Sequence, residues 1–338
     1  MKEYMEVDTA ALREPEVHNS LYKNRSAVAQ MQAQDTPEIT VLVLAYNRLE
    51  KTKRCVESIL KYTKGVSYEL LLIDNGSSDE TLAYYQSISH EPKRLIRVTK
   101  NLGPYFPQGL LSPNDFCRYV AAIPNDVIVT EHWLENMLVC IKSDPKIGMV
   151  TTVSSNVSNL QEVSLGFRSY EEMQQKAEQF NRSDPRKWED RLRMITLCSL
   201  YRKEVIYLLG WPPGDIGFFH DFADDDASFA IRRVGYRVVL AGDTWVCHDH
   251  DFRHGEGKNI DEYNRSLEIG RQNFRDKYLG IDAWEDVNNY LLPYLKGFPT
   301  PPRLSKALVL GVDVRCGTPI LDIKNWLRQF GILETELS

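Results

Sequence analysis

The sequence predicts an α/β fold with a mainly parallel central sheet flanked by helices. Short apolar runs rich in β-branched residues alternate along the chain with amphipathic segments of helical period. The first of these runs end in polar loops, and their spacing is that of right-handed βαβ units, whose strands lie parallel. No internal repeat or low-complexity tract interrupts this pattern. The expected arrangement is therefore Rossmann-like, with ligands bound at the carboxyl ends of the strands.

Composition restricts the class of protein and of partner. The chain has 338 residues, a net charge of −6 and a pI near 5.7, so it lacks the basic balance that is typical of nucleic-acid binders. Neither a signal peptide nor a run of ~18 apolar residues is visible, which predicts a cytoplasmic protein. The six cysteines include no Cys-x-x-Cys pair, so we expect reduced thiols rather than a zinc or disulfide framework.

The first predicted strands bring polar loops to one edge of the sheet. Residues 1–37 are polar and are predicted to form an N-terminal extension outside the core. Residues 38–44 (EITVLVL) and 68–73 (YELLLI) are strand-like runs followed by helical segments, and residues 95–98 form a third strand. Because parallel strands share their carboxyl edge, the loops AYNR, DNGSSD and KNLG should lie close together.

The stretch 119–130 (YVAAIPNDVIVT) is the centre of the predicted site. An apolar strand that stops at Pro-Asn-Asp presents the carboxylate of Asp126 where ligands bind, although the same three residues also form ordinary turns. The loops lack the glycine pattern of a dinucleotide or P-loop cradle, so a diphosphate here needs a divalent metal or Arg and Lys. The residues predicted to hold a nucleotide at this edge are Tyr46, Asn47, Arg48, Asp74, Asn75, Asn101, Gly103, Asn125 and Asp126.

The second half continues the alternation with a long insertion. A helix is predicted over residues 131–141 and a strand over 147–153, and another strand-like run covers 192–201. Between them, residues 154–187 are polar and hold one helix near 170–180. We expect this insertion to be a binding loop or a lid on the acceptor side.

An acidic triplet, Asp224, Asp225 and Asp226, opens a predicted helix that ends at Gly235. One interpretation is that these carboxylates offset the helix dipole, and the other is that at least one of them is catalytic. Further strands are predicted at 236–241 and 244–247.

Two histidines follow the last of these strands in the segment His248-Asp249-His250. A lone histidine is usually structural, but His-x-His with a carboxylate elsewhere matches a set of nitrogen and oxygen metal ligands. We therefore predict that one of His248 and His250 contacts a metal or a phosphate.

The C-terminal part is predicted to hold helices at 261–277 and 283–295, a Pro-rich link and a tail over 298–338. The tail carries a short apolar stripe at Ile323, Trp326, Leu327 and Phe330. This stripe fits packing on its own domain or on a further module, or contact with the inner face of a membrane.

Together these motifs resemble the family 2 glycosyltransferases with a GT-A fold. The runs that carry the resemblance are ITVLVLAYNRLEKTKRCVESIL, YELLLIDNGSSDETL, NLG, IPNDVIVTEHWLENML and DDDASFAIRRVGYRVVLAGDTWVCH. The resemblance covers residues 38 to about 254, roughly two thirds of the chain. The resemblance implies a GT-A domain over 38–297, with a nucleotide-sugar half at 38–126 and an acceptor half at 127–297, between N- and C-terminal extensions.

The resemblance also implies roles for single residues. Tyr46 corresponds to the aromatic residue that packs on the nucleotide base, and Asp74 to the carboxylate that hydrogen-bonds it. Asp126 corresponds to the last acid of the Asp-x-Asp motif, which binds Mn²⁺ or Mg²⁺. Pro124 stands at the first acidic position, which makes a histidine ligand more important.

The acidic triplet corresponds to the part of the family that holds the catalytic base. Asp224 aligns with that base, but Ala223 replaces the preceding Glu, so the choice among Asp224, Asp225 and Asp226 stays open. The segment 104–107 (PYFP) departs from the family pattern as well.

The implied activity is transfer of a sugar from a nucleotide-diphosphate donor, UDP-linked, to a hydroxyl of a growing glycan, with inversion and metal assistance. One alternative is a nucleotidyltransferase, which would need a more basic loop than Arg48 and Lys51 provide. The other is a degenerate domain that binds sugar nucleotide or glycan without turnover.

Overall fold

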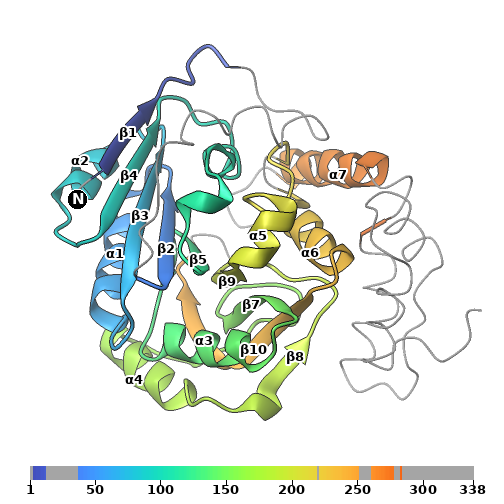
Figure 1. The fold of residues 1–338 in the computed structure, drawn as a ribbon. Coiled ribbons are helices and arrows are strands. Elements are labelled where there is room, and N and C mark those ends of the chain that lie inside the picture. Colours follow the sequence, from blue (N-terminus) through green and yellow to red (C-terminus); the bar gives the residue numbers. More distant parts are fainter. Residues whose placement is uncertain (1–2, 13–36, 219–220, 251–259, 278–281, 284–338) are drawn as a thin grey trace, which may run out of the picture.

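The structure, a computed structural model, describes residues 3–12, 37–218, 221–250, 260–277 and 282–283 (Figure 1). The predicted helix at 283–295 and the tail at 298–338 lie outside this part of the chain, except for residue 283. None of the helices described is both long and apolar enough to cross a membrane.

A mainly parallel sheet forms the centre of the molecule, in the order β1-β4-β3-β2-β5-β9-β7-β10-β6, with β8 paired to β10. The strands from β1 to β5 are parallel, β9 is antiparallel to both of its neighbours, and β7 and β10 are parallel. The strands are β1 (Glu3–Val7), β2 (Ile39–Ala45), β3 (Tyr68–Asn75), β4 (Lys93–Val98), β5 (Tyr119–Pro124), β6 (Val127–Ile128), β7 (Ile147–Ser154), β8 (Trp188–Asp190), β9 (Ser199–Arg202) and β10 (Arg237–His248).

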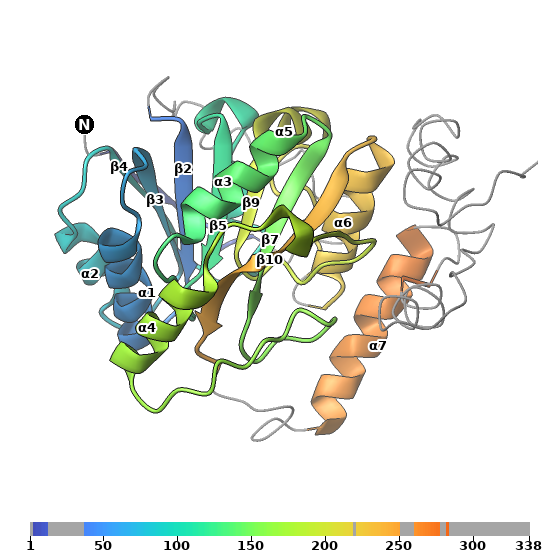
Figure 2. The same ribbon diagram turned by 90° about the horizontal axis from the view of Figure 1, so that it is seen from below.

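Helices cover both faces of this sheet. In both views α7 lies beside α6, at the end of the molecule away from α1 and α2 (Figure 1; Figure 2). The α-helices are α1 (Leu49–Tyr62), α2 (Thr81–Ser87), α3 (Trp133–Ser143), α4 (Tyr170–Phe180), α5 (Lys203–Leu209), α6 (Ala223–Arg233) and α7 (Ile260–Lys277), and 3-10 turns occur at Gln108–Leu110, Pro113–Asp115 and Pro185–Lys187.

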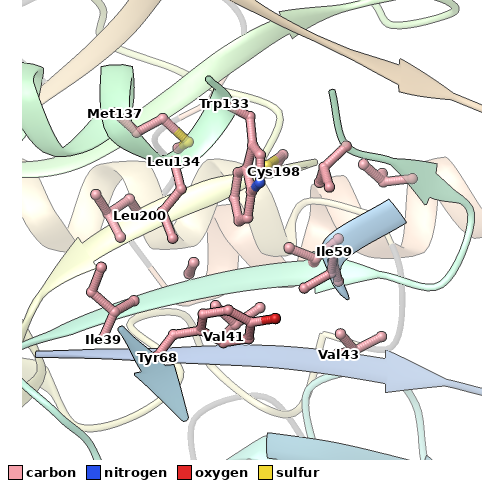
Figure 3. Packing of buried hydrophobic residues seen from close by; sticks show 14 of the residues in the cluster. Ile39, Val41, Val43, Ile59, Tyr68, Trp133, Leu134, Met137, Cys198 and Leu200 are labelled. Carbon is pink, nitrogen blue, oxygen red and sulfur yellow. The ribbon is translucent and has the colours of Figure 1, made fainter. Parts of the chain in front are cut away.

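Alternation along β2 shows how the sequence specifies the two faces. Ile39, Val41 and Val43 are fully buried on the face covered by α1 and α3, where they pack with Ile59, Trp133 and Met137 (Figure 3). Leu42 points to the opposite face and packs in a second cluster that includes Trp211. Each fully buried aliphatic side chain of this kind contributes about 1.5–3 kcal/mol. A strand buried on both sides needs the continuous apolar run that the sequence shows.

The structure corrects three sequence-based predictions. Residues 3–7, assigned to an extension outside the core, form β1 and pair with β4 at the edge of the sheet. The run 192–201 is a strand only over Ser199–Arg202. The strands predicted at 236–241 and 244–247 are one strand, Arg237–His248, with a break in register between Ala241 and Trp245.

Candidate active site

A cavity of about 430 Å³ opens at the carboxyl edge of the sheet, on the face that carries Leu42 and Leu44. The predicted site residues that line it are Asp126, Asp224, Asp225, His248 and His250. Side chains separated widely along the chain thus meet at one place. Of the insertion 154–187, by contrast, Ser158 alone lines this cavity, and α4 packs against β10.

The loop after β2 is held in an unusual backbone conformation. Asn47 and Arg48 have φ values of 54° and 61°, in the left-handed region that costs non-glycine residues about 1 kcal/mol or more. Hydrogen bonds fix the loop, since the Asn47 N–H donates to Ser77 Oγ at 2.9 Å and Asn125 Nδ2 donates to the Asn47 carbonyl at 3.1 Å. Asn125 therefore supports the loop rather than facing the cavity. Tyr46 stays 44% exposed beside it.

Asp74 is a fully buried carboxylate at the end of β3. Its Oδ1 accepts the Ser77 N–H at 3.0 Å, while Oδ2 has no hydrogen-bond partner among the described residues and lies 3.9 Å from Arg97 Nε. Burial raises the pKa of Asp74 and outweighs the hydrogen bonds from Ser77 and the charge of Arg97. An unpartnered buried oxygen of this kind is suited to accept an N–H from a ligand.

The other polar residues predicted at this edge bond to each other. Asn75 Nδ2 donates to Asn101 Oδ1 at 3.1 Å and to the Gly103 carbonyl at 3.2 Å, and the Gly103 N–H donates to Asn101 Oδ1 at 2.9 Å. Gly76 makes this possible, because a Cβ there would lie 2.9 Å from Asn101 N. These residues join the loops after β3 and β4.

Asp126 and His248 lie close enough together that one metal ion could be held between them. His248 Nε2 lies 3.7 Å from Asp126 Oδ2, and His248 Nδ1 lies 2.9 Å from the carbonyl of Asn156. A carbonyl can only accept, so Nδ1 carries the proton and Nε2 keeps its lone pair in the neutral ring. An ion about 2.1 Å from each ligand atom spans at most about 4.2 Å between them, so 3.7 Å fits one shared ion.

The groups around Asp126 favour its ionised form. Burial alone would raise the pKa of Asp126, but His248, His250 and Arg48 together outweigh it and lower that pKa. The Arg48 guanidinium lies 3.8 Å from Asp126 Oδ2. The carboxylate is therefore ionised at neutral pH, as a metal ligand must be.

A metal held by Asp126 and His248 would need further ligands from a substrate or from water. Across the residues that the structure describes, no group of three or more His, Cys, Asp or Glu side chains forms a metal cage. One carboxylate and one imidazole would suit a transition-metal ion such as Mn²⁺ better than Mg²⁺, which prefers oxygen ligands, and substrate phosphates and water would fill the remaining positions. The His250 ring packs edge-on against His248 at 4.8 Å, on the cavity wall. Asp249 turns away and pairs with Arg54 at 2.8 Å.

The structure separates the three acids of the triplet. Asp226 is fully buried, where its carboxylate accepts the Asp215 N–H at 2.6 Å and pairs with Lys277 at 2.9 Å. Asp225 pairs with Arg193. These two carboxylates are held by cations, so they stabilise the start of α6.

Asp224 has a different environment from its two neighbours. Its Oδ1 accepts hydrogen bonds from the hydroxyls of Thr196 and Tyr105, the latter at 3.3 Å, and the residue lines the cavity. Neither Tyr105 nor Thr196 was among the residues predicted from the sequence to form the site. The one signal for Tyr105 was that the segment 104–107 departs from the family pattern, and Thr196 gave none.

Comparison with known proteins relates the chain to glycosyltransferases. A family model described as "Glycosyl transferase family 2" matches residues 40–208. The succinoglycan biosynthesis protein ExoO of Rhizobium meliloti (strain 1021) is 30% identical over 133 residues, which cover 39% of this chain and 36% of that protein. The uncharacterised protein y4gI of Sinorhizobium fredii (strain NBRC 101917 / NGR234) is 28% identical over 120 residues, 34% of this chain and 13% of that protein. The chain thus matches well under two thirds of the length of either relative.

A solved structure supports the fold. GalNAc-T7 with UDP, GalNAc and Mn²⁺ superposes with a TM-score of 0.51 at 13% sequence identity, over 78% of this chain and 58% of that chain. At this identity the likeness shows the fold alone. The predicted GT-A fold is confirmed.

Proposed function

This chain belongs to glycosyl transferase family 2, and from that premise we propose that it transfers a sugar from a nucleoside diphosphate, UDP-linked, to a hydroxyl of a growing glycan. The observation that carries the proposal is that Asp126, His248 and Asp224 line one cavity at the carboxyl edge of the sheet. In this proposal a diphosphate bound beside Asp126 and the carboxylate of Asp224 lie within reach of one substrate. A cytoplasmic location is part of the same proposal.

In this proposal the donor occupies the edge that β2, β3 and β5 share. Tyr46, which is 44% exposed, stacks on the base, and Asp74 Oδ2 accepts a base N–H. Arg48 lies beside Asp126 and contributes positive charge near the diphosphate. A bound Mn²⁺ or Mg²⁺, held by Asp126 and His248, supplies further neutralisation of the leaving diphosphate.

Asp224 acts as the general base in the transfer step. It accepts the proton of the acceptor hydroxyl while the acceptor oxygen forms a bond to the anomeric carbon of the sugar. The bond between that carbon and the diphosphate oxygen breaks in the same step, and the electron pair leaves with the nucleoside diphosphate. Because attack and departure are in line, the anomeric configuration is inverted.

The test compares the parent with Asp224→Asn. We expect kcat to fall by about 10²–10⁴-fold, the usual contribution of a general base, while the Kd for the nucleotide is unchanged. Glu178→Gln, on the exposed side of α4, is the matched control and should leave both constants unchanged. An Asp224→Asn variant with the parent's kcat would refute the base assignment.

A binding domain without turnover is the second candidate. It is favoured by Pro124, which leaves Asp126 as the carboxylate of the Asp-x-Asp position, and by Ala223, which is 1% exposed where the family has Glu. A thermal-shift screen of UDP-, dTDP- and GDP-sugars with and without Mn²⁺, run beside transfer assays, distinguishes a transferase from a binding domain, since a bound ligand raises apparent stability. Binding of one nucleotide class without transfer to any acceptor would favour the binding domain, and equal shifts from every nucleotide would contradict the UDP preference.

A further inference from the structure

Asp224 is held through one of its two oxygens. Oδ1 accepts hydrogen bonds from the Tyr105 hydroxyl at 3.3 Å and from the Thr196 hydroxyl, whereas no hydrogen bond reaches Oδ2 within the described residues. The three side chains come from separate segments, since Tyr105 follows β4, Thr196 precedes β9 and Asp224 lies in the first turn of α6. The contact therefore exists only in the folded site.

The direction of both hydrogen bonds is fixed by chemistry. An ionised carboxylate can only accept, so the phenol and the Thr196 hydroxyl each direct their single hydrogen to Oδ1. Burial, and then the charge of Asp224, raise the pKa of the Tyr105 phenol well above its ordinary value. Tyr105 thus stays a donor throughout the pH range in which the protein would work.

Neutral donors also distinguish this acid from its neighbours. Asp225 and Asp226 are held by Arg193 and Lys277, whose charges stabilise the ionised form. Hydroxyl groups orient a carboxylate without placing a full positive charge beside it. This is the support that a proton acceptor needs, because its orientation must be fixed within about 0.5 Å while its basicity is kept.

We propose that Tyr105 and Thr196 are positioning residues, which hold Asp224 so that Oδ2 is the oxygen left to take the acceptor's proton. The inference rests on the proposed function, because it assumes that Asp224 is the base. It also gives a role to the segment 104–107, where this sequence departs from its family.

The kinetic test uses Tyr105→Phe, Thr196→Val and the double variant, in the parent and in Asp224→Asn. In the parent we expect kcat to fall about 10-fold for each single change and about 100-fold for both, with nucleotide Kd unchanged, because a small misplacement of a reacting group costs rates of this order. In the Asp224→Asn background the same changes should alter kcat by less than about twofold, since the positioned group is already lost. Equal losses in the two backgrounds would overturn the proposal.

The control is Tyr207→Phe, whose hydroxyl bonds Asn114 Oδ1 at 3.0 Å and whose side chain is 56% exposed on α5. It should leave kcat unchanged.

A crystal structure of the Tyr105→Phe, Thr196→Val protein tests the positioning without any assay. We expect the Asp224 side chain to leave its single conformation, and an unchanged carboxylate would overturn the proposal. If the parent transfers no sugar, the proposed function fails, while this structural comparison still decides whether the two hydroxyls hold Asp224.

Discussion

Nε2 of His248 faces Oδ2 of Asp126 at 3.7 Å, and strand pairing sets this distance. Asp126 directly precedes β6, and β6 pairs antiparallel with the end of β10, with Val127 opposite His248. The Asp249 N–H also donates to the Asp126 carbonyl at 2.8 Å. The spacing of Asp126 and His248 is therefore set by strand pairing, and it does not depend on a flexible loop.

Replacing His248 with Ala should weaken binding of Mn²⁺ in the presence of UDP by about 10–100-fold, because the ion loses its nitrogen ligand and keeps Asp126. Calorimetric titration of Mn²⁺ into protein saturated with UDP measures this change. His90→Ala is the control, since the His90 ring stacks on Tyr68 at 4.6 Å and does not line the cavity. Equal Mn²⁺ affinity in His248→Ala and the parent would remove His248 from the site.

Asp74→Asn should stabilise the protein at neutral pH while weakening UDP binding about 10-fold through loss of a buried hydrogen bond. Burial raises the folded-state pKa of Asp74, so the ionised carboxylate reduces stability above that pKa. The gain of the variant should shrink as the pH falls toward the unfolded value of about 3.9. Urea denaturation over a pH series measures the difference.

Asp79→Asn provides a control of opposite sign. Burial opposes the shift, but hydrogen bonds from Thr81 and Leu49 lower the pKa of Asp79, so its ionised form stabilises the fold above the unfolded pKa. This variant should be less stable than the parent at neutral pH, and its deficit should vanish as the pH falls through the folded pKa. If both variants shifted stability in the same direction at pH 7, the opposite pKa shifts of Asp74 and Asp79 would be contradicted.

Gly76→Ala should destabilise the fold by about 2–4 kcal/mol, because left-handed backbone strain adds to overpacking. Gly76 has a φ of 77°, and a Cβ there would meet Asn101 N at 2.9 Å and the Lys100 carbonyl carbon at 3.0 Å. Gly65 has a φ of 71° with nothing within 4 Å, so Gly65→Ala should cost about 1 kcal/mol from strain alone. Denaturant midpoints of the two variants give the comparison, and equal losses would show that the loops after β3 and β4 do not approach this closely.

Lys277→Met should cost about 3–5 kcal/mol, the usual loss when one partner of a buried ion pair is removed. Lys277 lies 3.2 Å from Asp215 and 2.9 Å from Asp226, and both carboxylates are fully buried. Lys142→Met is the control and should cost about 0–1 kcal/mol, because its pair with Glu38 is 43% and 40% exposed. Similar losses in both would mean that α7 is not anchored to α6 through this lysine.

The sequence predicted the sheet best where strands are buried on both faces. β2, β3 and β5 are continuous apolar runs, and their positions are confirmed. β1 was missed because EYMEV is an edge strand with alternating polar residues, and Tyr4 in it is 50% exposed. The strand predicted over 192–201 began too early, because buried apolar residues such as Met194 lie in irregular structure before β9.

The placement of the candidate residues at one edge of the sheet was predicted from the sequence, but their hydrogen-bond and ion-pair partners were not. Parallel strands bring their carboxyl ends together, so Asp126, Asp74 and Tyr46 could be placed at one edge from order alone. The roles of the acidic triplet could not be separated, because they depend on Arg193, Lys277 and other residues that only the folded chain brings close. The order of residues along the chain does not show which distant side chains will form these ion pairs.

The most direct test of the metal-assisted site is a crystal of the protein with a UDP-hexose and Mn²⁺, examined by anomalous scattering at the manganese edge. We expect one manganese peak within about 2.4 Å of both Asp126 Oδ2 and His248 Nε2, in contact with the diphosphate and in the same cavity as Asp224. A manganese peak bound elsewhere, or a donor bound with no metal near Asp126, would contradict it.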